Sequence, residues 1–286
     1  MSNVKVIYSE KKSYCSICSG RGYLYKPSAR KKQFSFLEIC ECIEKKCQCE
    51  KKTPYMVFNE KERILEECAC LPVRRKIEKT IDNFKTSNIP VRFRYRRISE
   101  FEIKNNDKET QNNLIMALDN AHHFIERFST EQSENIRGLY IFGPPGTGKT
   151  FLACLILNEL ILQYGISVKY VKITRDFFNE IKSTFNLEAA LKRRGDDIFK
   201  ELLDKDVLVI DDFGVQADTS WEQRTLYDLI DARYEYDKPT IITSNLSPEE
   251  ISEMNLFGGR IVSRLKEMTE FQPIICSDYR DNFQEI

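Results

Sequence analysis

An eight-residue glycine-rich stretch constrains the fold of this chain more than any other feature. Residues 143–150 read GPPGTGKT, which matches the P-loop pattern G-x-x-x-x-G-K-[ST]. The apolar run 138–142 suits a buried strand before the loop, and residues 151–163 suit a helix after it. In that context the loop's backbone N–H groups and the helix N-terminus both favour a phosphate. The pattern therefore predicts an α/β nucleotide-binding domain with a parallel sheet.

Every residue of this loop is expected to contribute to nucleotide binding. Lys149 is expected to reach the β- and γ-phosphates of ATP, and the Thr150 hydroxyl to hold Mg²⁺. The predicted ATP-binding residues are Gly143, Pro144, Pro145, Gly146, Thr147, Gly148, Lys149 and Thr150.

A second motif with catalytic potential lies about 60 residues downstream of the P-loop. The apolar run 207–210 predicts a buried parallel strand, and Asp211 and Asp212 follow it directly. Ligands of open α/β sheets bind at this end of the strands. Asp211 is expected to hold Mg²⁺, and Asp212 to orient or deprotonate the attacking water. Asn245, which follows the predicted strand 240–244, is placed to hydrogen-bond the γ-phosphate or that water.

The cysteines are concentrated near the N-terminus and predict a structural Zn²⁺ site. Eight of the ten precede residue 71 in close pairs. A nucleotide-binding protein of a reducing compartment keeps thiols reduced, so paired cysteines favour metal ligation. Structural zinc takes four ligands, and the preferred set is Cys15, Cys18, Cys68 and Cys70. A second site is then available to Cys40, Cys42, Cys47 and Cys49. A rival grouping joins Cys15 and Cys18 to Cys40 and Cys42.

Charge is distributed unevenly along the chain and indicates two domains with different partners. Residues 1–97 carry 23 Lys and Arg against 11 Asp and Glu, and residues 98–286 carry 21 against 33. We expect a cysteine-rich domain over 1–75, a linker and helix over 76–105, and an ATPase domain over 106–286. No apolar run approaches a membrane span, and the N-terminus lacks a secretory leader. These two features predict a cytoplasmic protein with no membrane partner.

A basic, aromatic segment precedes the predicted ATPase domain. Residues 91–97 read VRFRYRR, in which arginines alternate with aromatic residues. Such a segment can bind single-stranded nucleic acid through phosphate attraction and base stacking. It can also pack its aromatic rings against the ATPase domain, and this second interpretation is preferred.

Together these motifs resemble the AAA+ ATPases of the DnaC/DnaI helicase-loader family, and the related IstB transposition helpers. Residues 86–101, TSNIPVRFRYRRISEF, resemble the segment that leads into the family's ATPase domain. VLVIDDFG resembles its Walker B motif, with Asp-Asp in place of Asp-Glu, and TSN resembles its sensor-1 strand. GGRIVSRL, residues 258–265, resembles the box that carries the arginine finger. The cysteines followed by LPVRR are similar to the zinc-bearing, helicase-binding domain of the DnaI branch.

The resemblance implies a fold and a set of roles. The fold would be a three-layer αβα AAA+ domain without a C-terminal helical lid, preceded by a small zinc-binding domain. Asn245 would be sensor 1, Arg264 the arginine finger with Arg260 in reserve, and Arg280 lies where a sensor-2 arginine is found. The catalytic set is then Lys149, Asp211, Asp212, Asn245, Arg264 and Arg260.

The resemblance also implies an activity and partners. The protein would be a slow ATPase, stimulated by DNA or by assembly, that loads the replicative DNA helicase onto single-stranded DNA. ATP sites at subunit interfaces would favour an ATP-dependent ring or spiral. The alternative is an IstB-like transposition helper. Because the net charge is zero, we expect modest, salt-sensitive DNA affinity.

Overall fold

The computed structural model describes residues 15–26, 37–103, 107–129, 135–173, 198–214, 220–254 and 258–278. The chain forms two compact units, Met1–Ile81 and Asp82–Ile286, and the boundary falls within helix α2 (Leu71–Thr86). Arg280 lies outside the described residues. Among the helices of the described ranges, none is long and apolar enough to cross a membrane.

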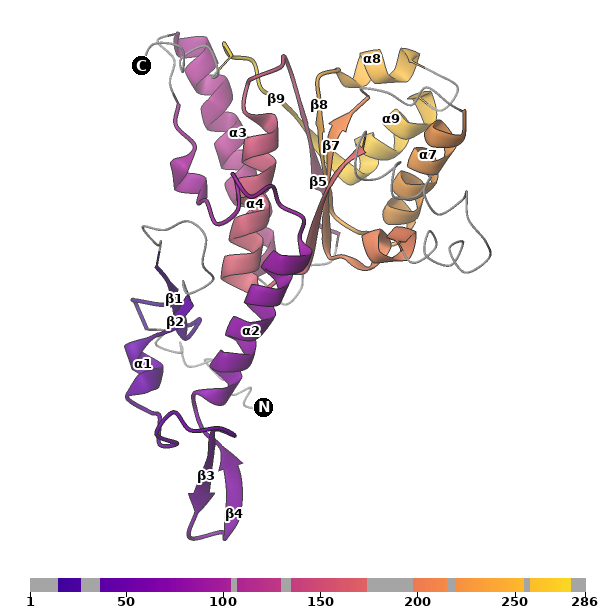
Figure 1. The fold of residues 1–286 in the computed structure, drawn as a ribbon. Coiled ribbons are helices and arrows are strands. Elements are labelled where there is room, and N and C mark those ends of the chain that lie inside the picture. Colours follow the sequence, from indigo (N-terminus) through magenta and orange to yellow (C-terminus); the bar gives the residue numbers. More distant parts are fainter. Residues whose placement is uncertain are drawn as a thin grey trace, which may run out of the picture. The chain divides into compact units, whose positions relative to one another are not determined.

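The first unit contains two small antiparallel hairpins (Figure 1). One pairs β1 (Tyr23–Tyr25) with β2 (Leu37–Ile39), which is followed by the short helix α1 (Glu41–Glu44). The other pairs β3 (Met56–Asn59) with β4 (Ile64–Glu67). Strands this short bury little apolar surface, and most of the buried side chains of this unit are cysteines. A core of this size is too small to hold the unit together without a further stabilising element.

The second unit is built on a five-stranded parallel sheet in the order β6-β7-β8-β5-β9. Its strands are β5 (Gly138–Phe142), β6 (Val168–Lys172), β7 (Val207–Phe213), β8 (Thr240–Ser244) and β9 (Thr269–Pro273). The central strand β8 and its neighbour β7 are buried along almost their whole length. Continuous Val, Leu and Ile runs suit such strands, because both faces of a parallel sheet are covered by helices.

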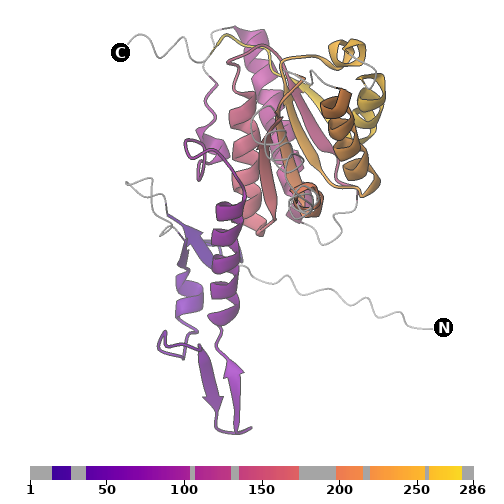
Figure 2. The same cartoon turned by 45° about the vertical axis from the view of Figure 1, so that its right-hand side comes forward.

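Helices cover both faces of this sheet, as Figures 1 and 2 show. One face carries α3 (Lys108–Glu126) and α4 (Lys149–Tyr164). The other carries α7 (Ser220–Glu235), α8 (Pro248–Glu253) and α9 (Gly258–Met268). The predicted three-layer αβα architecture with a parallel sheet is therefore confirmed.

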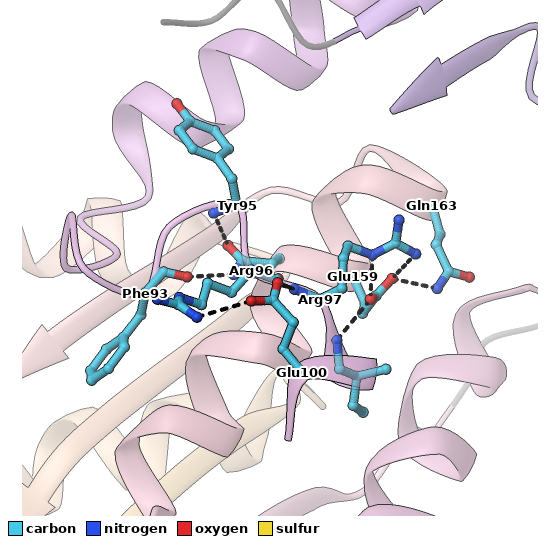
Figure 3. Close-up of polar contacts among 9 residues, drawn as sticks. Phe93, Tyr95, Arg96, Arg97, Glu100, Glu159 and Gln163 are labelled. Atoms are coloured by element: carbon cyan, nitrogen blue, oxygen red, sulfur yellow. Dashed lines mark hydrogen bonds and ion pairs between the residues drawn. The ribbon is translucent and has the colours of Figure 1, made fainter. Parts of the chain in front are cut away.

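The middle of helix α4 is a long apolar run that is interrupted by two buried polar residues, Asn158 and Glu159. Asn158 Nδ2 donates to the carbonyls of Phe93, at 2.8 Å, and Arg96, at 2.9 Å. Glu159 accepts two hydrogen bonds from the Arg97 guanidinium, at 2.6 and 2.8 Å (Figure 3). Although burial raises it, the bonds from Arg97 and Gln163 bring the pKa of Glu159 below its usual range.

These contacts decide between the two interpretations of the basic, aromatic segment. Phe93 packs on Phe151 of α4 with ring centroids 5.4 Å apart, and Tyr95 packs on Phe84 at 4.7 Å. Polar groups of the segment also bind α4, because Asn158 donates to two of its carbonyls and Glu159 pairs with Arg97. The preferred prediction, that the segment packs against the ATPase domain, is confirmed.

Candidate functional site

The P-loop connects β5 to α4, as predicted, and its shape depends on glycine. Gly143 has φ 146°, and a Cβ there would lie 2.1 Å from the carbonyl oxygen of Ile274. Gly148 caps α4 in the left-handed conformation, with φ 90°. Side chains at these two positions would force the loop apart. The loop thus leads into the N-terminus of a buried helix, and the free backbone N–H groups of such a terminus favour an anion.

The side chain of Lys149 lies against this loop. Its side-chain Nζ donates to the carbonyls of Gly143, at 2.8 Å, and Pro144, at 2.6 Å, and the residue is 8% exposed. An ammonium held at the loop by short hydrogen bonds adds positive charge where the backbone amides converge. The predicted phosphate-binding lysine therefore lies with its charge at the loop.

Asp211 is the centre of a hydroxyl cluster at the carboxyl end of the sheet. Its Oδ1 accepts from the Thr150 hydroxyl at 2.7 Å and from the Thr243 hydroxyl at 2.5 Å. Its Oδ2 accepts from the Tyr170 hydroxyl at 2.6 Å. Burial, together with the neighbouring Asp211 carboxylate, raises the pKa of Tyr170 far above its usual value, so this hydroxyl remains a donor.

The structure thus brings together the two predicted Mg²⁺ ligands, Thr150 and Asp211. Hydroxyl and carboxylate oxygens are the ligands that Mg²⁺ prefers, so the donor set fits this ion. Sequence reasoning missed Tyr170 and Thr243. The signal that could have found them, their place on β6 and β8 beside Asp211, appears only once the strand order is known.

The backbone of Asp212 adopts a left-handed conformation, unlike that of Asp211. Its φ is +57°, the left-handed region, and the β7–β8 register shifts between Ile210 and Phe213. The carboxylate forms a 2.5 Å ion pair with Lys172, the last residue of β6. The left-handed backbone at Asp212 costs on the order of 1 kcal/mol, and strained residues of this kind concentrate at functional sites.

In the described part of the chain, Asn245 and the two predicted finger arginines are not among the residues that contact Asp211. Asn245 follows β8 directly and is exposed, and Thr243 rather than Asn245 contacts Asp211. Arg264 lies on α9, where its Nε donates to Asp231 at 2.6 Å and its guanidinium stacks on the Tyr234 ring at 4.5 Å. The hydrogen bond to Asp231 raises the pKa of Arg264 above its usual value. Arg260 is exposed on the same helix.

The structure corrects the preferred grouping of the cysteines. Two sets of four thiols form, each with all sulfur atoms within 4.8 Å of one another: Cys15, Cys18, Cys40 and Cys42; and Cys47, Cys49, Cys68 and Cys70. The set that joined Cys15 and Cys18 to Cys68 and Cys70 was wrong, as was the second site of Cys40, Cys42, Cys47 and Cys49. The rival grouping of Cys15 and Cys18 with Cys40 and Cys42 is the one that the structure forms.

Hairpin pairing explains this grouping. In the first hairpin Tyr23 pairs with Ile39, which brings the chain before β1 beside the chain after β2. In the second, Met56 pairs with Glu67, which does the same for the residues that flank β3 and β4. Each hairpin therefore joins two cysteine pairs that are close in sequence to its own strands.

Both clusters have the chemistry of a four-coordinate thiolate site. All eight cysteines are free thiols, and five are buried. A backbone N–H from Cys18 lowers the pKa of Cys15 to about 7, and one from Cys70 lowers the pKa of Cys68 to about 6. Four sulfur ligands in a small, closed cluster are typical of structural zinc, so the donor sets fit this ion.

The fold and the site together define an ATP-binding protein with an AAA+-like P-loop domain. Residues 32–264 match the model of the family described as "IstB-like ATP binding protein". This chain belongs to that family.

Known relatives add detail to this assignment. The replicative helicase loader DnaC of Escherichia coli (strain K12) is 32% identical over 150 residues, which cover 52% of this chain and 57% of DnaC. The DnaC of Buchnera aphidicola subsp. Schizaphis graminum is 31% identical over 141 residues. The matched region thus spans just over half the length of these curated relatives.

Solved structures agree on the fold. The crystal structure of the DnaC helicase loader superposes with a TM-score of 0.53 at 26% identity, covering 64% of this chain and 99% of that one. The crystal structure of DnaI superposes with a TM-score of 0.55 at 21% identity, covering 66% of this chain and 96% of that one. The resemblance to the DnaC/DnaI group that the motifs predicted is confirmed.

Proposed function

We propose that this protein is an ATP-dependent loader of the replicative DNA helicase. The observation that carries the proposal is the 32% identity to the DnaC helicase loader over 150 residues. The separate cysteine-rich unit supports it, because this unit is a second body through which a partner can be held. ATP binding and hydrolysis would act as the switch between holding the helicase and releasing it on single-stranded DNA.

The site residues suggest how hydrolysis would proceed. Lys149 and the loop amides would hold the phosphates of ATP, and Thr150 with Asp211 would hold Mg²⁺, which neutralises charge on the phosphates when bound. Tyr170 and Thr243 fix the Asp211 carboxylate from opposite sides. Asp212 would orient or deprotonate the attacking water once Lys172 has released it. Asn245 would hydrogen-bond the γ-phosphate or this water.

Arg264 would complete the ATP site of a neighbouring copy in a ring or spiral. Asp231 and Tyr234 hold its guanidinium in a defined orientation, which favours a positioned donor over a solvated side chain. A preorganised cation stabilises charge that develops on the transferring phosphate. Arg260, one turn earlier on α9, is the second candidate for this role.

Replacing Arg264 with Ala is expected to leave ATP binding intact and to reduce assembly-dependent hydrolysis by about 10²-fold, because one donor to the developing charge is lost. Measurement of steady-state phosphate release checks this, and Arg224→Ala, at an exposed position of α7, is the control. Mixing Arg264→Ala with Lys149→Ala should restore part of the activity, since each variant supplies what the other lacks. Normal hydrolysis by Arg264→Ala alone would disprove the assignment.

Co-elution with the replicative helicase of the same organism tests the proposed function. We expect a complex in the presence of ATP and Mg²⁺ that is lost when a zinc chelator is added, because the cysteine-rich unit is the proposed contact. A complex that survives chelation would move the contact to the other unit. No complex under any condition would contradict the loader proposal.

A transposition helper is the second candidate, because the matching family model is described as IstB-like. The two functions differ in the partner and in the DNA that is bound. ATP-dependent filament formation on duplex DNA, without binding to the helicase, would favour the transposition function.

A further inference from the structure

The residues that follow β9 form a strap along the P-loop, which we define as residues 274–278. Its first backbone N–H, at Ile274, donates to the Phe142 carbonyl at 2.7 Å. The next, at Ile275, donates to Asn113 Oδ1 of α3 at 2.9 Å. Asn113 also donates to the Pro273 carbonyl at 3.0 Å, so α3 holds the start of the strap. This strap therefore begins at a defined position beside the first residues of the loop.

The far end of the strap reaches the middle of the P-loop. The Cys276 thiol lies 3.7 Å from the Thr147 carbonyl oxygen. The Asp278 side chain contacts the backbone of Gly146, since a Cβ on that glycine would lie 2.0 to 2.1 Å from the three carboxyl atoms of Asp278. Gly146 is the fourth residue of GPPGTGKT, within the part of the loop that closes around phosphates.

Asp278 and Lys149 carry opposite charges, and both are close enough to the Cys276 thiol to shift its pKa. Burial raises the pKa of the Cys276 thiol, the Lys149 ammonium opposes the rise, and the Asp278 carboxylate adds to it. Both charges are thus within electrostatic reach of one thiol beside the loop. A phosphate group bound at the loop would be attracted by Lys149 and repelled by Asp278.

We propose that Asp278 is a specificity-determining residue of the nucleotide site, which disfavours nucleotides in proportion to the negative charge of their phosphates. Two like charges a few ångströms apart near a protein surface repel appreciably, and the repulsion grows with each phosphate charge. Tight binding of ATP would therefore require the Asp278 end of the strap to move away from Gly146. The start of the strap, held by Phe142 and Asn113, can stay in place while this end moves.

The inference rests on nucleotide binding at the P-loop and is independent of the helicase as partner. The test is the Kd of ATP, ADP and adenosine for the full chain and for Asp278→Asn, measured by calorimetry at low and high salt. Asn has nearly the same shape and no charge. Asp119→Asn, an exposed aspartate of α3, is the matched control.

Asp278→Asn is expected to bind ATP roughly fivefold or more tightly, with a smaller gain for ADP, none for adenosine, and a gain that shrinks at high salt. Asp119→Asn should match the unmodified protein. Unchanged or weaker ATP binding by Asp278→Asn, in a protein with an unchanged melting temperature, would overturn the proposal. Asp278→Ser, measured in the same way, decides the matter if the Asn variant melts early. No ATP binding by either variant or by the unmodified chain would overturn the nucleotide site itself, and this inference with it.

Discussion

Replacing Lys149 with Ala is expected to weaken ATP binding by roughly 10³-fold and to abolish hydrolysis. Lys149 is 8% exposed, and its ammonium is held at the loop by two carbonyl oxygens. In the ATP complex it would instead donate two or more charge-assisted hydrogen bonds to phosphate, each contributing about 1.5–3 kcal/mol. Titration with a fluorescent ATP analogue and with ATP itself measures the loss.

Lys79→Ala, on an exposed position of α2, is the control for a lysine removed elsewhere. The far-UV circular dichroism and melting temperature of Lys149→Ala should stay close to those of the unmodified chain, because the two loop carbonyls can be hydrated. ATP affinity within a few-fold of normal in a folded Lys149→Ala protein would refute the assignment of this lysine to the phosphates.

Removing metal from the cysteine-rich unit is expected to unfold that unit and to leave the ATP-binding unit folded. We expect two Zn²⁺ per chain, since the two clusters each offer four thiols. The apparent binding energy of structural zinc is about 10–16 kcal/mol, which exceeds what the small apolar core of this unit supplies. Metal analysis after chelation, with hydrogen exchange read separately over the two units, checks this. Protection of residues 37–70 that survives complete removal of zinc would contradict it.

Double substitutions test the grouping of the thiols directly. Cys18→Ser with Cys42→Ser removes two ligands of one cluster, so one Zn²⁺ should remain. Cys18→Ser with Cys68→Ser damages both clusters, so both ions should be lost. The grouping preferred on sequence grounds predicts the reverse outcome for the two pairs, and zinc content therefore separates the alternatives without a structure.

Much of the ATP-binding site could be predicted because it is encoded locally. A P-loop is one continuous stretch, in which glycines, lysine and threonine stand at set spacings between a strand and a helix. Asp211 follows the apolar run 207–210, and the carboxyl ends of parallel strands meet at the same edge of their sheet. Its approach to Thr150 could therefore be expected before the 2.7 Å contact was seen.

Contacts between residues far apart in the sequence were harder to foresee. Tyr170 and Thr243 reach Asp211 from neighbouring strands, and nothing in their own segments marks either one as a site residue. The same holds for Asp278, which lies 132 positions after Gly146 in the sequence and contacts it in the fold. Such contacts depend on strand order, which local patterns do not specify.

The sequence alone determined the class of this protein. Its P-loop, its buried strands and its eight paired cysteines specify a nucleotide-binding α/β domain and a segment whose thiols suit a metal ion, because each feature arises from residues close together in the chain. Only the tertiary structure decided which cysteines share a site, which hydroxyls hold Asp211, and that Asp278 lies on the P-loop. Those outcomes depend on the pairing of hairpins and the order of strands. Alternative pairings satisfy the local sequence equally well, so the free energy of packing summed over the whole unit decides between them.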